Sequence, residues 1–120
     1  MVRAVRGAIT VEENTKESIL SATQELLEKI ISDNGIEHDD LIQIIFTLTP
    51  DLDAVFPAAA ARKMGITDVP LMCMSEIPVK GALNKCVRIL LEMNSEKTLH
   101  DIKHIYLKGA KVLRPDLAGK

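Results

Sequence analysis

The sequence has no tryptophan, one tyrosine and two phenylalanines among its 120 residues. Domains that bind nucleic acids usually carry a strongly basic surface and aromatic side chains on which bases stack. Here 15 Lys and Arg residues stand against 17 Asp and Glu residues, which gives a formal net charge of -2. The scarcity of aromatic residues and the slightly acidic balance both argue against a nucleic-acid partner.

Long apolar runs are also missing. The longest segment without a charged residue is Leu41 to Pro50, far shorter than the ~20 residues that cross a bilayer. Arg3 and Arg6 interrupt the apolar N-terminal stretch, which therefore does not have the uninterrupted core of a secretory signal. The two cysteines, Cys73 and Cys86, do not form a CxxC motif. We expect no membrane partner, reduced thiols and a cytoplasmic location.

The hydrophobic pattern predicts alternating strands and helices. Val2 to Val11 is rich in β-branched residues, which is typical of a strand. Asn14 is predicted to cap a helix, with Glu17 completing a capping box, and apolar residues at helical spacing continue to Asn34 and Gly35. A second helix is predicted from Pro57 to Gly65, and further strands at residues 41–49, 69–74, 86–93 and 102–107.

This order of elements predicts one α/β (α+β) domain over residues 1–120. The expected architecture is a mixed β-sheet of about five strands with two main helices on one face. Residues 114–120, which contain Pro115 and Gly119, are predicted to form a mobile tail. Two helices are too few to cover both faces of such a sheet, so we expect the chain to form an oligomer.

Several common catalytic motifs are absent from the sequence. It contains no GxSxG elbow, phosphate-binding loop, GxGxxG, HExxH or paired-cysteine motif. His100 and His104 are four residues apart, but no third ligand lies near them, so we interpret them as surface or half-buried histidines and expect no metal site. Cys73 has no evident base beside it and is interpreted as a buried thiol rather than a nucleophile.

Two arginines stand in strongly apolar segments. Arg88 lies within Cys-Val-Arg-Ile-Leu-Leu, where its permanently charged guanidinium needs a carboxylate, a solvated edge or an anionic ligand. Arg6 lies in a similar context, and strand alternation places Arg3 and Arg6 on opposite faces. An internal ion pair of Arg88 with Glu76 would explain the first arginine equally well.

Two further residues are candidates for the same site. Glu76 follows a predicted strand, where binding sites are often built, although a solvated loop glutamate is the simpler interpretation. Tyr106 is the one tyrosine, although a core residue with a bonded hydroxyl is the simpler interpretation. Preorganised cations without an evident nucleophile favour a small polyanionic organic ligand over hydrolysis or redox chemistry.

Six segments, in order along the chain, resemble the monofunctional, trimeric α/β type of chorismate mutase. The resemblance extends from Val2 to about Leu117. The segments are Arg3–Glu12 (RAVRGAITVE), Thr49–Ala58 (TPDLDAVFPA), Val69–Glu76 (VPLMCMSE), Lys85–Arg88 (KCVR), His104–Leu107 (HIYL) and Leu113–Leu117 (LRPDL). Each segment is short, but six in the same order across a chain of matching length make a specific signal.

The resemblance implies rearrangement of chorismate to prephenate, on the route to Phe and Tyr, without a cofactor or metal. It implies a homotrimer in which the sheets form the core (a pseudo-barrel) and the active sites lie at subunit interfaces. It places Arg88 beside the ether oxygen of the substrate, Arg6 and Tyr106 at a substrate carboxylate, and Glu76 and Cys73 near the ring hydroxyl. The residues it implies for lining the pocket are Phe56, Ala58, Ala59, Arg62, Leu71, Met72, Leu113 and Arg114.

One position departs from the family pattern. Ala59 stands where the family often has a lysine, so a cation at the rim of the pocket is missing. Two alternatives to the mutase remain at this stage. The first is a non-catalytic, trimeric regulatory module that binds a small anion, and the second is another chorismate-using enzyme such as a lyase.

Overall fold

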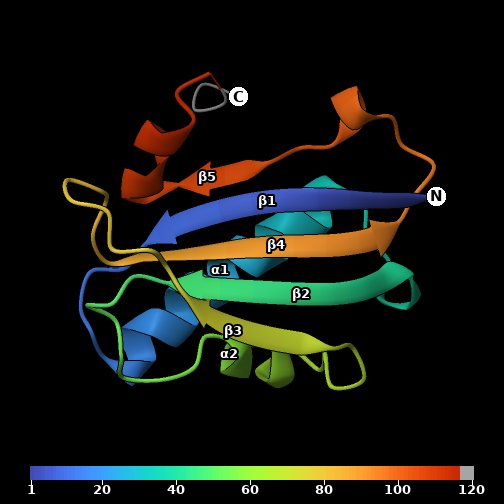
Figure 1. Cartoon of the computed structure of the whole chain (residues 1–120). Helices are drawn as coiled ribbons and strands as arrows, with labels where there is room; N and C mark the ends of the chain where they lie inside the picture. The colour runs from blue at the N-terminus through green and yellow to red at the C-terminus, as the bar shows by residue number, and fades with distance from the viewer. Residues whose placement is uncertain (117–120) are drawn as a thin grey trace.

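The computed structural model describes residues 1–116, whose strands form a single mixed sheet (Figure 1). The strand order is β3-β2-β4-β1-β5. Strand β4 pairs antiparallel with both β1 and β2, whereas the β1–β5 and β2–β3 pairs are parallel. The strands are β1 (Val2–Thr10), β2 (Leu41–Leu48), β3 (Leu71–Ser75), β4 (Cys86–Asn94) and β5 (Ile105–Leu107). This confirms the prediction of a mixed sheet of five strands.

Both α-helices lie on the same face of the sheet, behind it in Figure 1. They are α1 (Lys16–Asp33) and α2 (Ala58–Lys63). Three short 3-10 helices complete the described elements: η1 (His38–Asp40), η2 (Leu99–Asp101) and η3 (Lys108–Leu113). The predicted arrangement of two main helices on one face is therefore confirmed.

The start of α1 differs from the prediction. Thr15, not Asn14, is the N-cap, because the Thr15 hydroxyl accepts a hydrogen bond from the backbone N–H of Ser18 at 3.1 Å. The side chain of Asn14 instead accepts from the backbone N–H groups of Asp53 and Ala54. The predicted capping box at Asn14 and Glu17 is therefore wrong, because the Asn14 side chain is hydrogen-bonded to the loop at Asp53 and Ala54.

The predicted strand at residues 102–107 is too long. Residues 99–101 form a 3-10 turn, and the strand contains only Ile105 to Leu107. Of the predicted tail, residues 117–120 lie outside the described residues. Within the described part, the half-buried Arg114 donates two hydrogen bonds to Asp116, at 3.0 and 2.8 Å. The mobility of the tail stays a prediction.

The hydrophobic core fills the space between the sheet and the helices. Alternate residues of the strands, such as Val5, Phe46 and Leu91, are fully buried against Leu26 and other residues of α1. At Gly7 a methyl group would lie 2.8 Å from Ile30 Cδ1 and 3.0 Å from the carbonyl oxygen of Ile105. The glycine therefore lets α1 pack directly on the sheet.

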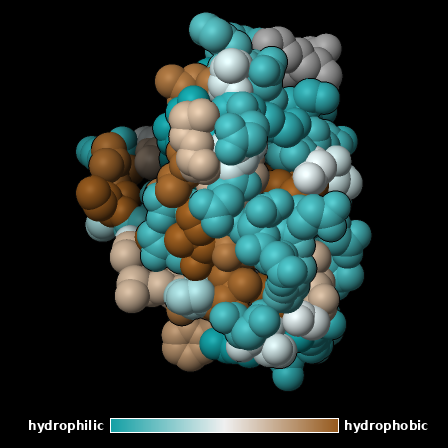
Figure 2. Space-filling model, turned by 90° about the vertical axis from the view of Figure 1, so that its right-hand side faces the viewer, coloured by the Kyte–Doolittle hydropathy of each residue, from teal (hydrophilic) through white to brown (hydrophobic). Residues whose placement is uncertain are grey.

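The opposite face of the sheet, here called the open face, carries neither α-helix (Figure 1), and among the described residues the 3-10 helix η3 packs over its β1–β5 end through Ala110 and Leu113. In Figure 2, which shows the molecule from the side, hydrophobic side chains project on the left, the side of this face. Met72, Met74 and Leu90 are exposed there because their neighbours in sequence point into the core. None of the described helices is long and apolar enough to cross a membrane.

Candidate active site

A single row of residues crosses the open face from one edge of the sheet to the other. Met74 of β3 pairs with Thr47 of β2, and Thr47 pairs with Arg88 of β4. Arg88 pairs with Ala8 of β1, which pairs with Tyr106 of β5. Because directly paired residues share a face of a sheet, these five side chains project from the same side. Arg88 therefore lies at the centre of the open face.

Arg88 and Glu76 form an ion pair at this centre. The Nε atom of Arg88 lies 3.5 Å from Oε2 of Glu76, and the two side chains are 35% and 22% exposed. Glu76 continues from the end of β3, where its backbone N–H donates to the carbonyl oxygen of Leu48 at 2.9 Å. The carboxylate also accepts a hydrogen bond from the Thr47 hydroxyl. The predicted ion pair is thus present, and it leaves the guanidinium partly open to solvent rather than enclosed.

Arg6 projects from β1 on the same face, beside Tyr106 and His104. As alternation predicted, Arg3 points the other way, and its Nε donates to the carbonyl oxygen of Lys97 at 2.8 Å. The backbone N–H of Arg6 donates to Nδ1 of His104 at 3.0 Å. Burial lowers the pKa of His104, and the positive charges of Arg114 and Arg6 lower it further. The imidazole is therefore held in its neutral form, as a hydrogen-bond acceptor.

These groups surround one cavity of about 360 Å³. Arg6, Arg88, Glu76 and Tyr106 all line it, so the structure brings four of the five predicted catalytic residues together. The remaining wall is formed by Gly7, Ile45, Thr47, Met74, Ile89 and Leu90. Two guanidinium groups, one carboxylate, a phenol and the Thr47 hydroxyl among apolar side chains suit a small ligand with several anionic groups and a hydroxyl.

Cys73 and Phe56 line a different cavity, of about 680 Å³, at the β3 edge of the sheet. Cys73 pairs with Phe46 and packs against the core on the helix side, so it points away from the open face. Phe56 is 72% exposed in the loop before α2. Within one chain the structure therefore does not bring Cys73 or Phe56 to Arg88, although Met74 lines both cavities.

The other predicted pocket residues are distributed over three elements. On α2, Ala58 is buried in the core, Ala59 is half-buried and Arg62 is exposed. On β3, Leu71 packs against the core, whereas Met72 is exposed on the open face. Leu113, at the end of η3, packs against the small cluster formed by Ala8, Cys86, Tyr106 and Ala110. Leu113 and Arg114 thus lie at the Tyr106 side of the Arg88 cavity, and the residues of α2 do not.

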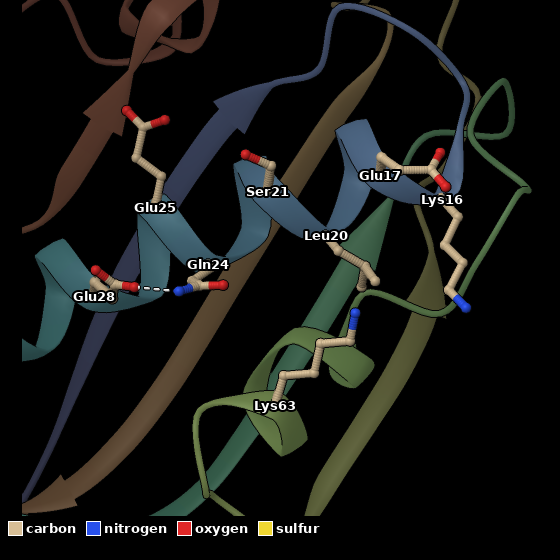
Figure 3. A pocket seen from close by; sticks show the side chains of 8 residues that line it. All are labelled: Lys16, Glu17, Leu20, Ser21, Gln24, Glu25, Glu28 and Lys63. Atoms are coloured by element: carbon tan, nitrogen blue, oxygen red, sulfur yellow. Dashed lines mark hydrogen bonds between the residues drawn. The ribbon is translucent and has the colours of Figure 1, made fainter.

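A groove between α1 and α2, of about 710 Å³, contains none of the predicted site residues (Figure 3). Two of its acidic side chains have partners within the chain. Gln24 donates to Glu28 at 2.6 Å, and Glu25 lies 3.5 Å from the ammonium group of Lys108. Lys63 reaches from α2 towards Leu20 of α1 (Figure 3). We interpret this groove as the solvated outer surface of the helix layer.

The second cysteine, Cys86, does not add a reactive thiol to the site. Cys86 is buried next to Arg88, and burial raises the pKa of its thiol to about 11, although the nearby guanidinium opposes the shift. The thiol therefore stays protonated and inert at neutral pH. Within residues 1–116 no group of three or more His, Cys, Asp or Glu side chains is placed to hold a metal ion.

The sequence did not single out Thr47 or Ala8, which both belong to the row through Arg88. Residues 41–49 form a continuous apolar run, so the pattern gave no sign of which residues face the helices. The signal available was the hydroxyl of Thr47, one of the two threonines in that run. The small size of Ala8 beside Gly7 was the corresponding signal on β1.

The fold and the cavity define a small α+β protein with two arginines, a glutamate and a tyrosine around one cavity. A family model described as chorismate mutase type I matches residues 2–117. The chain therefore belongs to the type I chorismate mutase family, whose members are isomerases, and the non-catalytic alternative is not favoured.

Individual relatives agree with this assignment. The chain is 46% identical over 119 residues to chorismate mutase AroH of Bacillus subtilis (strain 168), covering 98% of this chain and 94% of the relative. It is 48% identical over 118 residues to chorismate mutase AroH of Thermus thermophilus, covering 98% and 97%. A solved chorismate mutase from Clostridium thermocellum superposes with a TM-score of 0.90 at 55% identity, covering 92% of this chain and 98% of that one.

Proposed function

We propose that this protein converts chorismate to prephenate in the cavity that holds Arg88, Glu76, Arg6 and Tyr106. A [3,3] rearrangement is unimolecular and requires neither proton transfer nor a covalent intermediate. It requires the compact, diaxial conformer of the substrate and stabilisation of the charge that develops as the C–O bond breaks. The cavity supplies fixed cations and lacks an activated nucleophile, which matches those two requirements.

In this mechanism Arg88 lies beside the ether oxygen. Its interaction strengthens as that oxygen becomes negative, so it stabilises the transition state more than the ground state. Arg6 and Tyr106 bind a substrate carboxylate and hold the reactive conformer. Glu76 accepts a hydrogen bond from the ring hydroxyl of the substrate. The observation that carries the proposal is the position of Arg88, which is central on the open face and only partly paired.

The complete site is proposed to form between subunits of a homotrimer. The exposed apolar side chains of the open face support burial against a second copy of the chain. The cavity with Phe56 and Cys73 on one subunit would then complete the cavity with Arg88 on its neighbour, bringing Cys73 near the ring hydroxyl. The further lining would come from Ala58, Ala59, Arg62, Leu71, Met72, Leu113 and Arg114.

Because Ala59 stands where the family often has a lysine, this site has one cation fewer. We therefore expect catalysis to be retained and substrate binding to be weaker. Both free cysteines are compatible with the reducing cytosol, where we place the enzyme.

The deciding experiment is incubation of the pure protein with chorismate and identification of the product by chromatography. Prephenate supports the proposal. Recovery of unchanged chorismate despite saturable binding would indicate a non-catalytic module, and loss of pyruvate from the substrate would indicate a lyase. Sedimentation velocity of the same sample measures the oligomeric state.

The shared site has its own test. Arg88→Ala removes a group from the half of the site supplied by one subunit, and Phe56→Asp alters the half supplied by its neighbour. Each variant alone is therefore expected to be nearly inactive. Unfolding and refolding them together in equal amounts should restore about a quarter of the wild-type activity by random assortment of subunits. If the mixed sample stays inactive while refolded wild type recovers, the two halves do not combine across subunits.

A further inference from the structure

We propose that Thr47 is a positioning residue, whose hydroxyl holds the Glu76 carboxylate away from full pairing with Arg88. This inference rests on the proposed function, in which Arg88 must be available to the substrate. Thr47 lies on β2 and pairs directly with Arg88 of β4, so the two side chains are neighbours on the open face. The Thr47 hydroxyl donates to Oε2 of Glu76, the same oxygen that faces Nε of Arg88.

The two charged groups lie farther apart than in a tight ion pair. An unrestrained carboxylate and guanidinium prefer a two-point contact with N···O distances of about 2.7–2.9 Å. Here Nε and Oε2 are 3.5 Å apart. The carboxylate is therefore near enough to orient Arg88 but not close enough to bind it tightly.

The backbone reinforces this arrangement from the other side. Glu76 is attached to β2 by the hydrogen bond from its backbone N–H to the carbonyl oxygen of Leu48, the residue after Thr47. Main chain and side chain of Glu76 are thus both fixed to consecutive residues of one strand. Loss of the hydroxyl would leave the backbone in place and free the carboxylate to rotate onto Arg88.

The first test is Thr47→Val, which removes the hydroxyl and keeps the shape. We expect kcat and kcat/KM to fall together by roughly 10- to 100-fold, the loss expected for a hydrogen bond to a charged group. Thr47→Ser should restore most of the activity.

Thr23→Val is the matched control, because the buried hydroxyl of Thr23 donates to the carbonyl oxygen of Ile19 in α1, behind the sheet. It should change stability without changing kcat. Wild-type kinetics for Thr47→Val would overturn the inference.

The second test asks whether Thr47 acts through Glu76. In a Glu76→Gln background, adding Thr47→Val should lower kcat by less than about threefold, because the group that Thr47 holds is already altered. If the loss of kcat in the double variant equals the product of the two single losses, Thr47 and Glu76 act independently, and the inference is overturned.

A crystal structure of Thr47→Val gives a readout that does not depend on activity. A shorter contact between Glu76 and Arg88, with two hydrogen bonds, supports the inference, and unchanged side chains contradict it. If the wild-type protein does not convert chorismate, the proposed function fails, and this crystal structure still decides whether Thr47 holds Glu76 in place.

Discussion

The backbone N–H of Arg6 donates to Nδ1 of His104 across the β1–β5 edge, at 3.0 Å. This bond exists only while Nδ1 is unprotonated. Burial and the charges of Arg114 and Arg6 lower the pKa of His104 below its usual 6.5. As the pH falls below about 6.5, the unfolded chain therefore takes up this proton before the folded chain does.

We therefore expect the free energy of unfolding to decrease as the pH falls from 7 to 5. The decrease begins near pH 6.5 and ends once the pH is below the folded-state pKa of His104. Denaturant unfolding at a fixed protein concentration measures it. His104→Gln, which keeps an acceptor but does not titrate in this range, should flatten the curve. The exposed His100 serves as control, through His100→Gln. Parallel curves for wild type and His104→Gln would contradict the prediction.

Arg88→Ala should fold and assemble but lose nearly all turnover. The side chain is partly exposed on the open face, and Glu76 keeps its hydrogen bond from Thr47, so no buried charge is left unpaired. Removal of one transition-state donor commonly lowers kcat by about 10² to 10³. Initial rates, thermal melting and sedimentation check the three parts of this prediction.

Arg3→Ala is the matched control for Arg88→Ala. Arg3 lies on the same sheet but faces the other way and donates to the carbonyl oxygen of Lys97. We expect it to lower stability slightly and to leave kcat unchanged. Wild-type kcat in Arg88→Ala would rule out the proposed role of Arg88.

The space occupied by Ala8 separates Arg88 from Tyr106 in the row across the open face. Ala8 is fully buried, so the two additional methyl groups of Ala8→Val must displace a neighbour at a cost of roughly 1–3 kcal/mol. We expect kcat/KM to fall about tenfold or more as Arg88 or Tyr106 moves. Ala22→Val, in the core on the helix side, should lower the melting temperature similarly without affecting kcat/KM. Equal kinetic effects of the two variants would mean that Ala8 acts only through stability.

The sequence predicted the strands and helices well because most of the relevant signals are local. β-branched runs and helical spacing require only neighbouring residues, whereas the insertion of β1 between β4 and β5 depends on pairings far apart in the chain. The capping error at Asn14 has the same origin, since the partner of its side chain is the loop at Asp53.

The charged residues of the site could be predicted from the sequence, but the face of the sheet on which they lie could not. Arg88 stands in an apolar run because Leu90, on the same face, is itself exposed and apolar, which hides the alternation of the strand. A single sequence therefore predicted a buried arginine where the structure has one at the centre of an uncovered face. Thr47 was not predicted as a site residue because its role depends on Glu76, which is 29 residues away in the sequence.

Truncation before Arg114 should raise KM more than it lowers kcat. Arg114 lies at the Tyr106 side of the cavity, where its charge contributes to the lowered pKa of His104, and we expect an anionic substrate to share it with Asp116. Loss of such a cation weakens binding in the ground state and the transition state alike, so we expect KM to rise roughly tenfold with kcat less affected. Truncation before residue 117, which keeps Arg114 and its bonds to Asp116, is the matched control and should raise KM less. Steady-state kinetics on both proteins decide the question, because an unchanged KM in the shorter protein would exclude a binding role for Arg114.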